Sequence, residues 1–279
     1  MAANHVLKID CADEKGLVHK VTGVLYRKNL NIVSNGEFVD HENRRFFMRT
    51  EYSGDADSLP IIQELAAALP KGASIELSPV RKKNIVILVT REHHCLADLL
   101  TRHAFGELHA NVLAVVSNHS HLKRLAGQFE VPYHAVPHEK KSRKAHEAAV
   151  LRVLSRYRPE FIVLAKYMRI LSPPFVRKFE NRILNIHHSF LPAFLGAHPY
   201  QQAAARGVKI IGATAHFVNE KLDKGPIIAQ DVVAVDHSHS VSDMTLAGHD
   251  VEKIVLAKAL RLVFEDRIFV SGNKTVIFD

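Results

Sequence analysis

The sequence predicts an α/β protein with two domains. Over residues 1–82 we expect a small ferredoxin-like βαββαβ unit, because strand-like and helix-like segments alternate there in that order. Over residues 83–279 we expect a doubly wound, mostly parallel sheet. Near-continuous apolar runs, typical of strands that are buried on both faces, alternate there with helical segments. A chain of 279 residues is long enough for two such domains.

Hydrophobic periodicity predicts each element of the first domain. The expected strands are His5–Asp10, Leu30–Val39, Arg44–Tyr52 and Ala73–Val80, and the expected helices are Gly16–Lys28 and Leu59–Leu69. Pro70 and Gly72 stop the second helix. The basic run from Arg81 to Lys83 is the expected joint between the two domains.

The second domain is predicted in the same way. Its expected strands are Asn84–Thr90, Val112–Val116, Phe161–Ala165, Ile183–Ile186, Ile210–Val218 and Ile227–Val235. Its expected helices are Lys144–Tyr157, a short helix opening at Ser172, and a long helix over Val241–Phe264. Residues 268–278, interrupted at Gly272-Asn273, are expected to form a closing hairpin.

Composition excludes several classes of protein. The net charge of +8 invites a nucleic-acid interpretation, but the basic residues are dispersed and Trp is absent, so no stacking platform is visible. Two cysteines exclude a disulfide framework. No apolar run approaches the roughly 18–20 residues that span a bilayer, and the N-terminus lacks a signal-peptide pattern. We therefore expect a cytoplasmic protein that binds neither nucleic acid nor membrane.

Three polar residues stand where chemistry on a carbonyl carbon can occur. Asn185 and His187 follow the run Ile183–Ile186, where we expect the chain to leave the strand, and Asp223 lies in a later turn. Asn can stabilise an oxyanion, His can carry a proton near neutral pH, and Asp can orient a water or the imidazole. In doubly wound sheets, ligands bind beyond the carboxyl ends of the strands, so this position favours an active site.

Each of these residues also has a structural interpretation. Asp223 could be an ordinary turn residue, and Asn185 could cap a loop. Two pairs of closely spaced histidines could ligate a metal, namely His119 with His121 and His237 with His239. No acidic or cysteine partner has suitable spacing near either pair, so we expect no metal site.

Motifs in three segments decide between these interpretations. Leu164–Ser172, Asn185–Pro192 and His216–Ile227 resemble, in this order, motifs of the formyltetrahydrofolate-using formyltransferase family. That family includes glycinamide ribonucleotide formyltransferase, methionyl-tRNA formyltransferase and formyltetrahydrofolate deformylase. Residues 1–80 resemble an ACT domain, including the segment Asp13–Val18.

Departures from the transferase pattern favour the deformylase branch. The purine enzymes carry a Gly-rich phosphate loop after their first strand, whereas Thr90–Leu100 contains no Gly. His188 replaces a Pro of the transferases, and an ACT-like domain is typical of the deformylases. A tRNA-acting member would need an added C-terminal domain. Cys95 is interpreted either as a buried apolar residue at a helix start or as a lining of the place where a transferase binds its acceptor.

The resemblance implies hydrolysis of 10-formyltetrahydrofolate to formate and tetrahydrofolate, which would supply formate for purine synthesis and balance folate pools. Asn185 would hold the oxyanion with help from His187, and Asp223 would position the water and His187 and handle a proton. The implied folate-binding residues are Met168, Arg169, Ile170, Leu171, Ser189, His216, Asn219, Glu220, Lys221 and Leu222. No cofactor is implied, because the folate is itself the substrate.

The resemblance also implies a homo-oligomer, with a possible amino-acid effector at Asp13, Gly16 and Leu17; a purely structural pairing role for that domain is the alternative. The main alternative activity is transfer of the formyl group to an amine acceptor. A regulatory binder without catalysis is a further alternative, which the retained Asn, His and Asp disfavour. A dinucleotide oxidoreductase is excluded because no Gly-x-Gly-x-x-Gly follows a strand.

Overall fold

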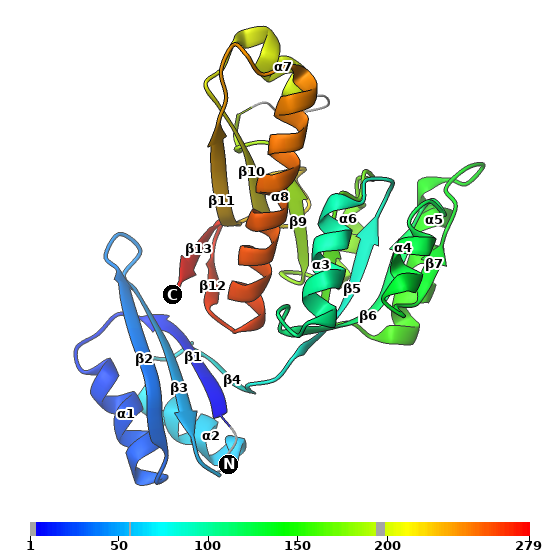
Figure 1. Ribbon diagram of the computed structural model, residues 1–279. Helices are drawn as coiled ribbons and strands as arrows, with labels where there is room; N and C mark the ends of the chain where they lie inside the picture. The colour runs from blue at the N-terminus through cyan, green and yellow to red at the C-terminus, as the bar shows by residue number, and fades with distance from the viewer. Residues whose placement is uncertain (1–3, 56, 194–198) are drawn as a thin grey trace. The chain divides into compact units, whose positions relative to one another are not determined.

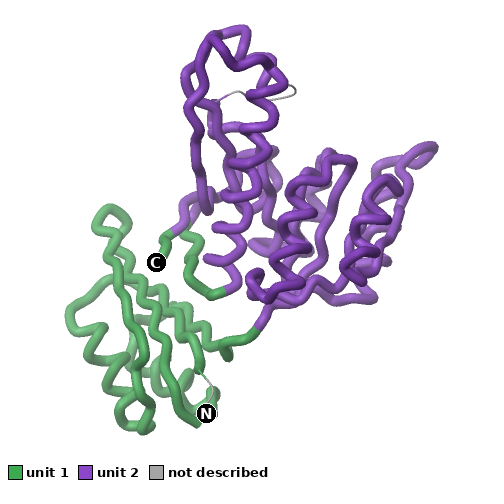
Figure 2. The backbone as a smooth tube through the Cα atoms, in the orientation of Figure 1, with its two compact units in different colours: residues 1–81, 265–271, 276–279 green, residues 82–264, 272–275 purple. Residues whose placement is uncertain are grey.

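The computed structural model describes residues 4–55, 57–193 and 199–279. The chain divides into two compact units, which Figure 2 shows in different colours. Unit 1 comprises Met1–Arg81 together with Glu265–Ser271 and Val276–Asp279. Unit 2 comprises Lys82–Phe264 and Gly272–Thr275.

Unit 1 has the predicted ferredoxin-like order. Its elements are β1 (Asn4–Ala12), α1 (Leu17–Arg27), β2 (Asn31–Asp40), β3 (Arg45–Ser53), α2 (Ser58–Ala68) and β4 (Ser74–Pro79). The strands pair antiparallel in the order β2-β3-β1-β4 (Figure 1). Leu7 and Ile9 of β1, Val21 of α1 and Leu65 of α2 are fully buried in one core. One apolar face of the sheet and two amphipathic helices account for this arrangement.

The C-terminal segment returns to the sheet of unit 1. Strands β12 (Ile268–Ser271) and β13 (Lys274–Ile277) form the expected hairpin around Gly272. Phe269 meets the ring of Phe47 edge-on at 5.5 Å between centroids. The guanidinium of Arg49 on β3 donates to the carbonyls of Glu265 (3.0 Å) and Asp266 (3.1 Å). Most of this hairpin therefore belongs to unit 1, whereas the sequence placed residues 268–278 with the second domain.

Unit 2 is built on a seven-stranded sheet. Its strands are β5 (Lys83–Val89), β6 (Ala110–Ser117), β7 (Tyr133–Ala135), β8 (Phe161–Leu164), β9 (Ile183–His187), β10 (Ile210–Phe217) and β11 (Ile227–Ala234). They follow the order β11-β10-β9-β8-β5-β6-β7. Each strand from β9 along the order to β7 is parallel to its neighbour. Strand β10 pairs antiparallel with both β9 and β11. The predicted mostly parallel sheet is confirmed.

Six helices of unit 2 lie in the described part of the chain: α3 (His94–Ala104), α4 (Lys123–Gln128), α5 (Arg143–Tyr157), α6 (Pro173–Lys178), α7 (Pro199–Arg206) and α8 (Val241–Phe264). The long helix α8 packs against β10, β11 and α3 (Figure 1). The sequence did not single out α4, α7 or β7, and it indicated α3 only through the helix start proposed at Cys95. Helix α4 and strand β7 are too short to show a periodic pattern.

The strand order brings three loops to one edge of the sheet. Strands β9, β8 and β5 are parallel neighbours, so their carboxyl ends lie together. The loops after β5 and β8 and the end of β9 therefore converge, beside the reversal of strand order at β5, where ligands bind in such sheets.

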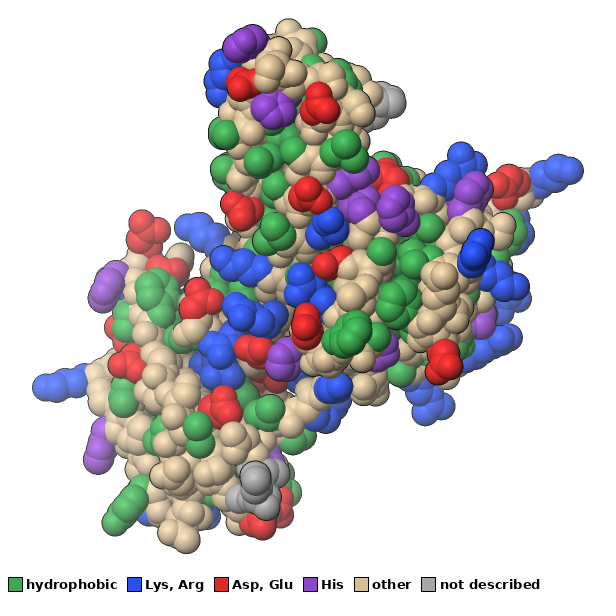
Figure 3. Space-filling view, in the orientation of Figure 1, with side chains coloured by type: hydrophobic (Ala, Val, Ile, Leu, Met, Phe, Trp, Pro, Cys, Tyr) green, Lys and Arg blue, Asp and Glu red, His purple; other side chains and the backbone are tan. Residues whose placement is uncertain are grey.

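Surface charge and hydropathy add two observations. On the face in Figure 3, Lys and Arg side chains are interspersed with acidic ones rather than gathered into one stripe. Among residues 4–55, 57–193 and 199–279, none of the helices has the length and apolar content that crossing a bilayer requires.

Candidate active site

Asn185 and His187 lie on strand β9 itself, which extends to His187. The expectation that the chain leaves the strand after Ile186 is therefore wrong. Alternate residues of a strand face the same side, so no departure is needed to bring the two side chains together. Asn185 is half-buried, whereas His187 is buried and 7 % exposed.

His216 on β10 faces Asn185 across the antiparallel pair. The Nδ1 of His216 lies 2.8 Å from the carbonyl of Phe217 and donates to it, which leaves Nε2 as an acceptor. The amide Nδ2 of Asn185 lies 3.2 Å from that Nε2 and donates one hydrogen to it. Its second hydrogen can donate to a ligand. His216, which the resemblance assigned to folate, thus orients Asn185.

The turn after β10 carries Asp223 to the same place. Asp223 adopts φ 53°, a left-handed conformation that Asp tolerates better than most residues. The side chain of Asn219 holds the turn, since its Oδ1 accepts from the amide of Lys221 (3.0 Å) and its Nδ2 donates to the carbonyl of Lys224 (3.2 Å). Gly225 closes the turn, because a Cβ there would stand 1.7 Å from the carbonyl oxygen of Phe217.

Gly225→Ala should therefore lower both stability and activity. The added methyl collides with backbone that cannot move without displacing the Asp223 turn, and overpacking of this kind costs about 1–3 kcal/mol. Thermal unfolding should show a lower Tm, and the rate of the reaction should fall. Gly127→Ala on α4 is the matched control, since its Cβ would meet nothing within 4 Å. An unchanged Tm and rate for Gly225→Ala would contradict this description of the turn.

These segments bring Asn185, His187, His216 and Asp223 into one cluster. Asp223 Oδ1 lies 3.5 Å from Nδ1 of His187 and 3.8 Å from Nε2 of His216. The Nε2 of His187 is buried and has no hydrogen-bond partner among the described residues. With Nδ1–H directed at the Asp223 carboxylate, Nε2 carries a lone pair that can accept a proton.

Burial decides the charge of this cluster. It lowers the pKa of His187 below the ordinary 6.5, although the Asp223 carboxylate acts in the opposite direction. Burial likewise lowers the pKa of His216, against the effect of its hydrogen bond to Phe217. Both imidazoles are therefore neutral near pH 7, and His187 is a proton acceptor there.

The acid side of the pH–rate profile should reflect this lowered pKa. If neutral His187 is the base, kcat/KM stays on its plateau as the pH falls through 6.5, the ordinary histidine value, and decreases only below it. Initial rates measured between roughly pH 4.5 and 9 would locate the acid limb, which is the part of the profile where the rate falls with decreasing pH. A limb above pH 6.5 would contradict a buried, neutral His187.

The predicted folate residues lie in two loops beside this cluster. Met168, Ile170 and Leu222 are large apolar side chains that are 56 %, 59 % and 59 % exposed, so their surfaces are accessible to a ligand. The first loop is held in shape by Glu147, whose carboxylate accepts from the amide and the hydroxyl of Ser172. The folate assignments stay predictions.

The other predicted folate residues lie near the same loops, with contacts of their own. The hydroxyl of Ser189 donates to the carbonyl of Ala193 (2.8 Å), so its first role is in the turn after β9. Glu220 pairs with Arg177 at 2.7 Å on the surface. Lys221 is exposed, and Arg169 and Leu171 are half-buried. Four members of this set have side chains that form hydrogen bonds or an ion pair within the protein: Ser189, His216, Asn219 and Glu220.

Sequence reasoning missed a buried ionic cluster beside this site. Lys166 and Glu252 are 5 % and 0 % exposed, and their charged groups lie 3.2 Å apart. The available signal was a carboxylate among the apolar residues of a long helix, since Glu252 lies between Val251 and Val255. A charge on a buried helix face needs a partner from elsewhere in the fold.

Three groups of described side chains have donor atoms close enough to hold a metal: Glu92/His94/His249, His94/Cys95/Glu252 and His119/His138/Glu139. In the first two, the ammonium of Lys166 already pairs with the carboxylates, at 3.6 Å from Glu92 and 3.2 Å from Glu252, and would repel a metal cation. The thiol of Cys95 is fully buried, and burial raises its pKa well above the ordinary value, so it is a poor ligand. The third group is partly exposed.

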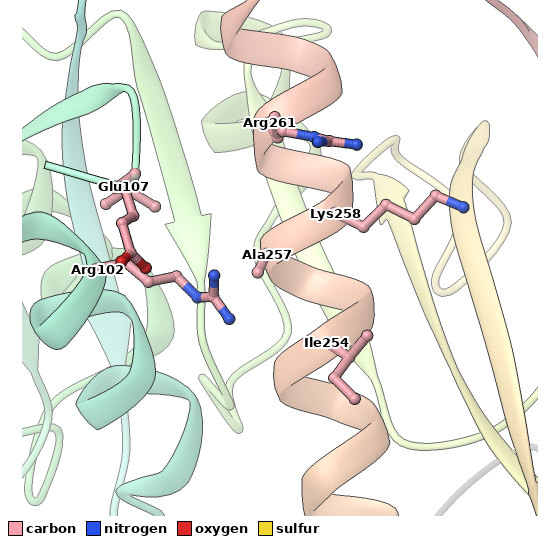
Figure 4. Close-up of a pocket in the computed structure, with 7 residues that line it drawn as sticks. Arg102, Glu107, Ile254, Ala257, Lys258 and Arg261 are labelled. Carbon is pink, nitrogen blue, oxygen red and sulfur yellow. The ribbon is translucent and has the colours of Figure 1, made fainter. Parts of the chain in front are cut away.

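A groove of about 310 Å³ lies elsewhere in unit 2, between α3 and α8 (Figure 4). Arg102, Lys258 and Arg261 line it together with Glu107. Arg102 is paired with Asp98 at 2.8 Å. None of the predicted catalytic or folate-binding residues is among the residues that line this groove.

In unit 1, the predicted effector loop precedes helix α1. Gly16 is the N-cap with φ 90°, a conformation that glycine adopts freely. Leu17 is buried in the core, and Asp13 is exposed with its amide bonded to the carbonyl of Arg44. An effector role for this loop stays a prediction.

Comparison with known proteins places the chain in a family. Residues 83–260 match the Formyl transferase family, and residues 5–70 match the ACT domain. The formyltetrahydrofolate deformylase of Escherichia coli K12 is 52 % identical over 272 residues, which cover 98 % of this chain and 97 % of that protein. The chain belongs to the formyltetrahydrofolate deformylase family.

Other members of the deformylase family agree in sequence and in structure. The deformylase of Haemophilus influenzae is 50 % identical over 277 residues, covering 99 % of this chain and all of that protein. The crystal structure of a deformylase from Pseudomonas syringae superposes with a TM-score of 0.95 at 41 % identity, covering 100 % of this chain and 95 % of that one. The predicted combination of ACT-like and formyltransferase-type domains is confirmed.

The deformylase family shares part of its fold with transferases. Glycinamide ribonucleotide transformylase 1 from Symbiobacterium toebii matches with a TM-score of 0.67 and 34 % identity, covering 71 % of this chain and 95 % of that one. This chain is thus longer than the transferase it resembles, as the ACT-like region requires.

Proposed function

We propose that this enzyme hydrolyses 10-formyltetrahydrofolate to formate and tetrahydrofolate at the cluster of Asn185, His187 and Asp223. The observation that carries the proposal is the buried Nε2 of His187, which has no hydrogen-bond partner among the described residues, close to the half-buried amide of Asn185. A proton acceptor and an oxyanion donor at one edge of the sheet are the two groups that attack by water on a formyl carbon requires.

The groups have separate roles in this reaction. Water attacks the formyl carbon as Nε2 of His187 takes its proton, and the second amide hydrogen of Asn185 stabilises the oxyanion. The carboxylate of Asp223, 3.5 Å from Nδ1, favours the tautomer with its hydrogen on Nδ1, which can act as a base through Nε2, and stabilises the imidazolium that forms. The carbon–nitrogen bond then breaks, and the proton on His187 passes to the departing folate nitrogen.

The start of α3 supports water, rather than an amine, as the acceptor. In place of a glycine loop, the chain carries Glu92 and the buried ring of His94, whose Nε2 lies 2.8 Å from Glu252. A phosphate group is held closely by backbone amides where glycines form the turn, and Thr90–Leu100 contains no glycine.

Release of formate without an acceptor tests the proposal. Purified enzyme incubated with 10-formyltetrahydrofolate alone should yield formate and tetrahydrofolate in equal amounts. Addition of amines, including glycinamide ribonucleotide, should neither raise the rate nor produce a formylated amine. Formation of a formylated amine, with formate absent, would establish transfer instead.

The surroundings of the reaction are part of the proposal. We propose that no cofactor takes part, that the released formate supplies purine synthesis in the cytoplasm, and that the chain forms a homo-oligomer.

The ACT-like match supports an amino-acid effector site at Asp13, Gly16 and Leu17. Isothermal titration with a panel of amino acids tests this site, and Asp13→Ala should weaken any binding that is found. Binding unaffected by that change would place the effector elsewhere.

A further inference from the structure

A network of buried polar side chains in unit 2 converges on Glu252. Its carboxylate accepts from the hydroxyl of Tyr200 (2.7 Å), and lies 2.8 Å from Nε2 of His94 and 3.2 Å from Nζ of Lys166. These partners come from α7, from α3 and from the loop after β8. Glu92, after β5, lies 3.6 Å from the same ammonium.

The network is buried and charged. Burial by itself raises the pKa of Glu252, but the hydrogen bond from His94 and the charge of Lys166 outweigh that effect and hold the pKa at about 2. The ionised carboxylate, which Tyr200 of α7 and His94 of α3 also contact, therefore attracts and orients the ammonium of Lys166. Lys166 also has φ 62°, a left-handed backbone conformation that is uncommon for a lysine.

Lys166 connects this network to the catalytic cluster through His188. Its ammonium lies 3.1 Å from Nδ1 of His188. An ammonium can only donate, so Nδ1 of His188 accepts and the ring is the neutral Nε2–H tautomer. That ring stacks on His187, with centroids 4.9 Å apart and planes 18° from parallel. Lys166 thus fixes the surface against which the His187 ring rests.

We propose that Lys166 and Glu252 are positioning residues for formyl hydrolysis, holding the His187 ring through His188 so that its Nδ1 faces Asp223. The inference rests on the proposed function, because it assigns His187 the part of the base. It adds two residues that are not among the predicted catalytic or folate-binding residues, although Lys166 lies in the same loop after β8 as Met168.

Electrostatics support the same role. The groups that face His187 are His216 from β10, Asp223 from the turn after it, His188 directly after β9, Lys166 from the loop after β8, and Glu252 from α8. Lys166 lowers the pKa of His187, and Glu252 raises it. Loss of the Lys166 charge should therefore move the acid limb of the pH–rate profile to higher pH, and loss of the Glu252 charge should move it to lower pH.

Lys166→Met tests the proposal most sharply, because methionine keeps the apolar stem and removes the ammonium. We expect kcat to fall about 10- to 100-fold, as it does when a reacting group is misplaced, with little change in KM. The acid limb of kcat should move to higher pH. Lys166→Arg keeps the positive charge and should return the limb toward its wild-type position.

A matched control is available on the same helix as Glu252. Lys253→Met makes the same chemical change at a partly exposed lysine that pairs with Asp250 at 2.7 Å, and should leave kcat and the acid limb unchanged. Glu252→Gln keeps the shape of the side chain and its hydrogen bond to Tyr200, and should move the limb to lower pH.

The variant Lys166→Met leaves Glu252 without its ammonium and can fail to fold. In that event the double variant Lys166→Met/Glu252→Gln removes both charges. It should retain a cooperative unfolding transition, lose kcat about 10- to 100-fold, and leave the limb near its wild-type position, because the two opposed charges are removed together.

The outcomes separate the two proposals. A wild-type enzyme that releases no formate refutes the proposed function, whatever the variants do. A wild-type enzyme that releases formate, with a Lys166→Met or double variant of normal kcat, refutes the positioning role alone. A lower kcat with a lowered Tm and an unmoved limb in the single variants would also overturn it, because a purely structural network has that signature.

Discussion

Asp223→Asn is expected to reduce kcat for formate release by roughly 100- to 10,000-fold, with a small change in KM. The asparagine keeps the size of the side chain and the left-handed turn, but it lacks the charge that stabilises an imidazolium at His187, whose Nδ1 lies 3.5 Å away. Its amide can also present a hydrogen to Nδ1, which would select the tautomer that cannot act as a base through Nε2. Steady-state kinetics of formate release measure the effect.

The control for this variant is Asp231→Asn on β11, an exposed carboxylate that accepts from the amide of Val232 at 2.8 Å. It should leave kcat near the wild-type value. Thermal unfolding of Asp223→Asn should resemble that of the wild type, because the turn is held by Asn219 and Gly225 and not by the carboxylate. Near-normal turnover by Asp223→Asn would remove Asp223 from the mechanism.

His187→Ala is expected to lower kcat by a similar factor, roughly 100- to 10,000-fold. The change removes the only group of the cluster whose unpartnered buried nitrogen can accept a proton from water. It also leaves a space beside the His188 ring, which the stack at 4.9 Å now fills. Imidazole added to the assay can occupy that space, so we expect partial recovery of the rate in proportion to neutral imidazole.

His121→Ala is the matched control, since His121 is exposed in the same unit and should be replaceable without effect on kcat. A His187→Ala enzyme that keeps its kcat would show that another group takes the proton. A loss of activity that coincides with loss of the cooperative unfolding transition would instead be a folding effect, so Tm must be measured in parallel.

Much of this architecture could be predicted because its signals are local. The βαββαβ order, the apolar run before Asn185 and the Gly-Pro pair after Asp223 are each readable within a few residues. The antiparallel pairing that sets His216 opposite Asn185 is not readable in this way. The contact between the His216 ring and the amide of Asn185 therefore came only from the structure, whereas the resemblance had assigned His216 to the folate.

Long-range partners account for the rest of what was missed. His94 and Glu252 are 158 residues apart, and only the packing of α3 against α8 brings their side chains together. The return of the C-terminal hairpin to β3 depends on hydrogen bonds from Arg49 to carbonyls 216 and 217 residues away. Such contacts follow from tertiary packing, and no periodicity of the sequence encodes them.

Isotope transfer from solvent tests the central claim most directly. A single turnover of 10-formyltetrahydrofolate in ¹⁸O-labelled water, without any amine, should yield formate that contains one solvent oxygen, as mass spectrometry would detect. The label should appear at the rate of tetrahydrofolate formation. Formate without the label would contradict attack by water at the Asn185–His187–Asp223 cluster. Tetrahydrofolate formed together with a formylated product other than formate would contradict it as well.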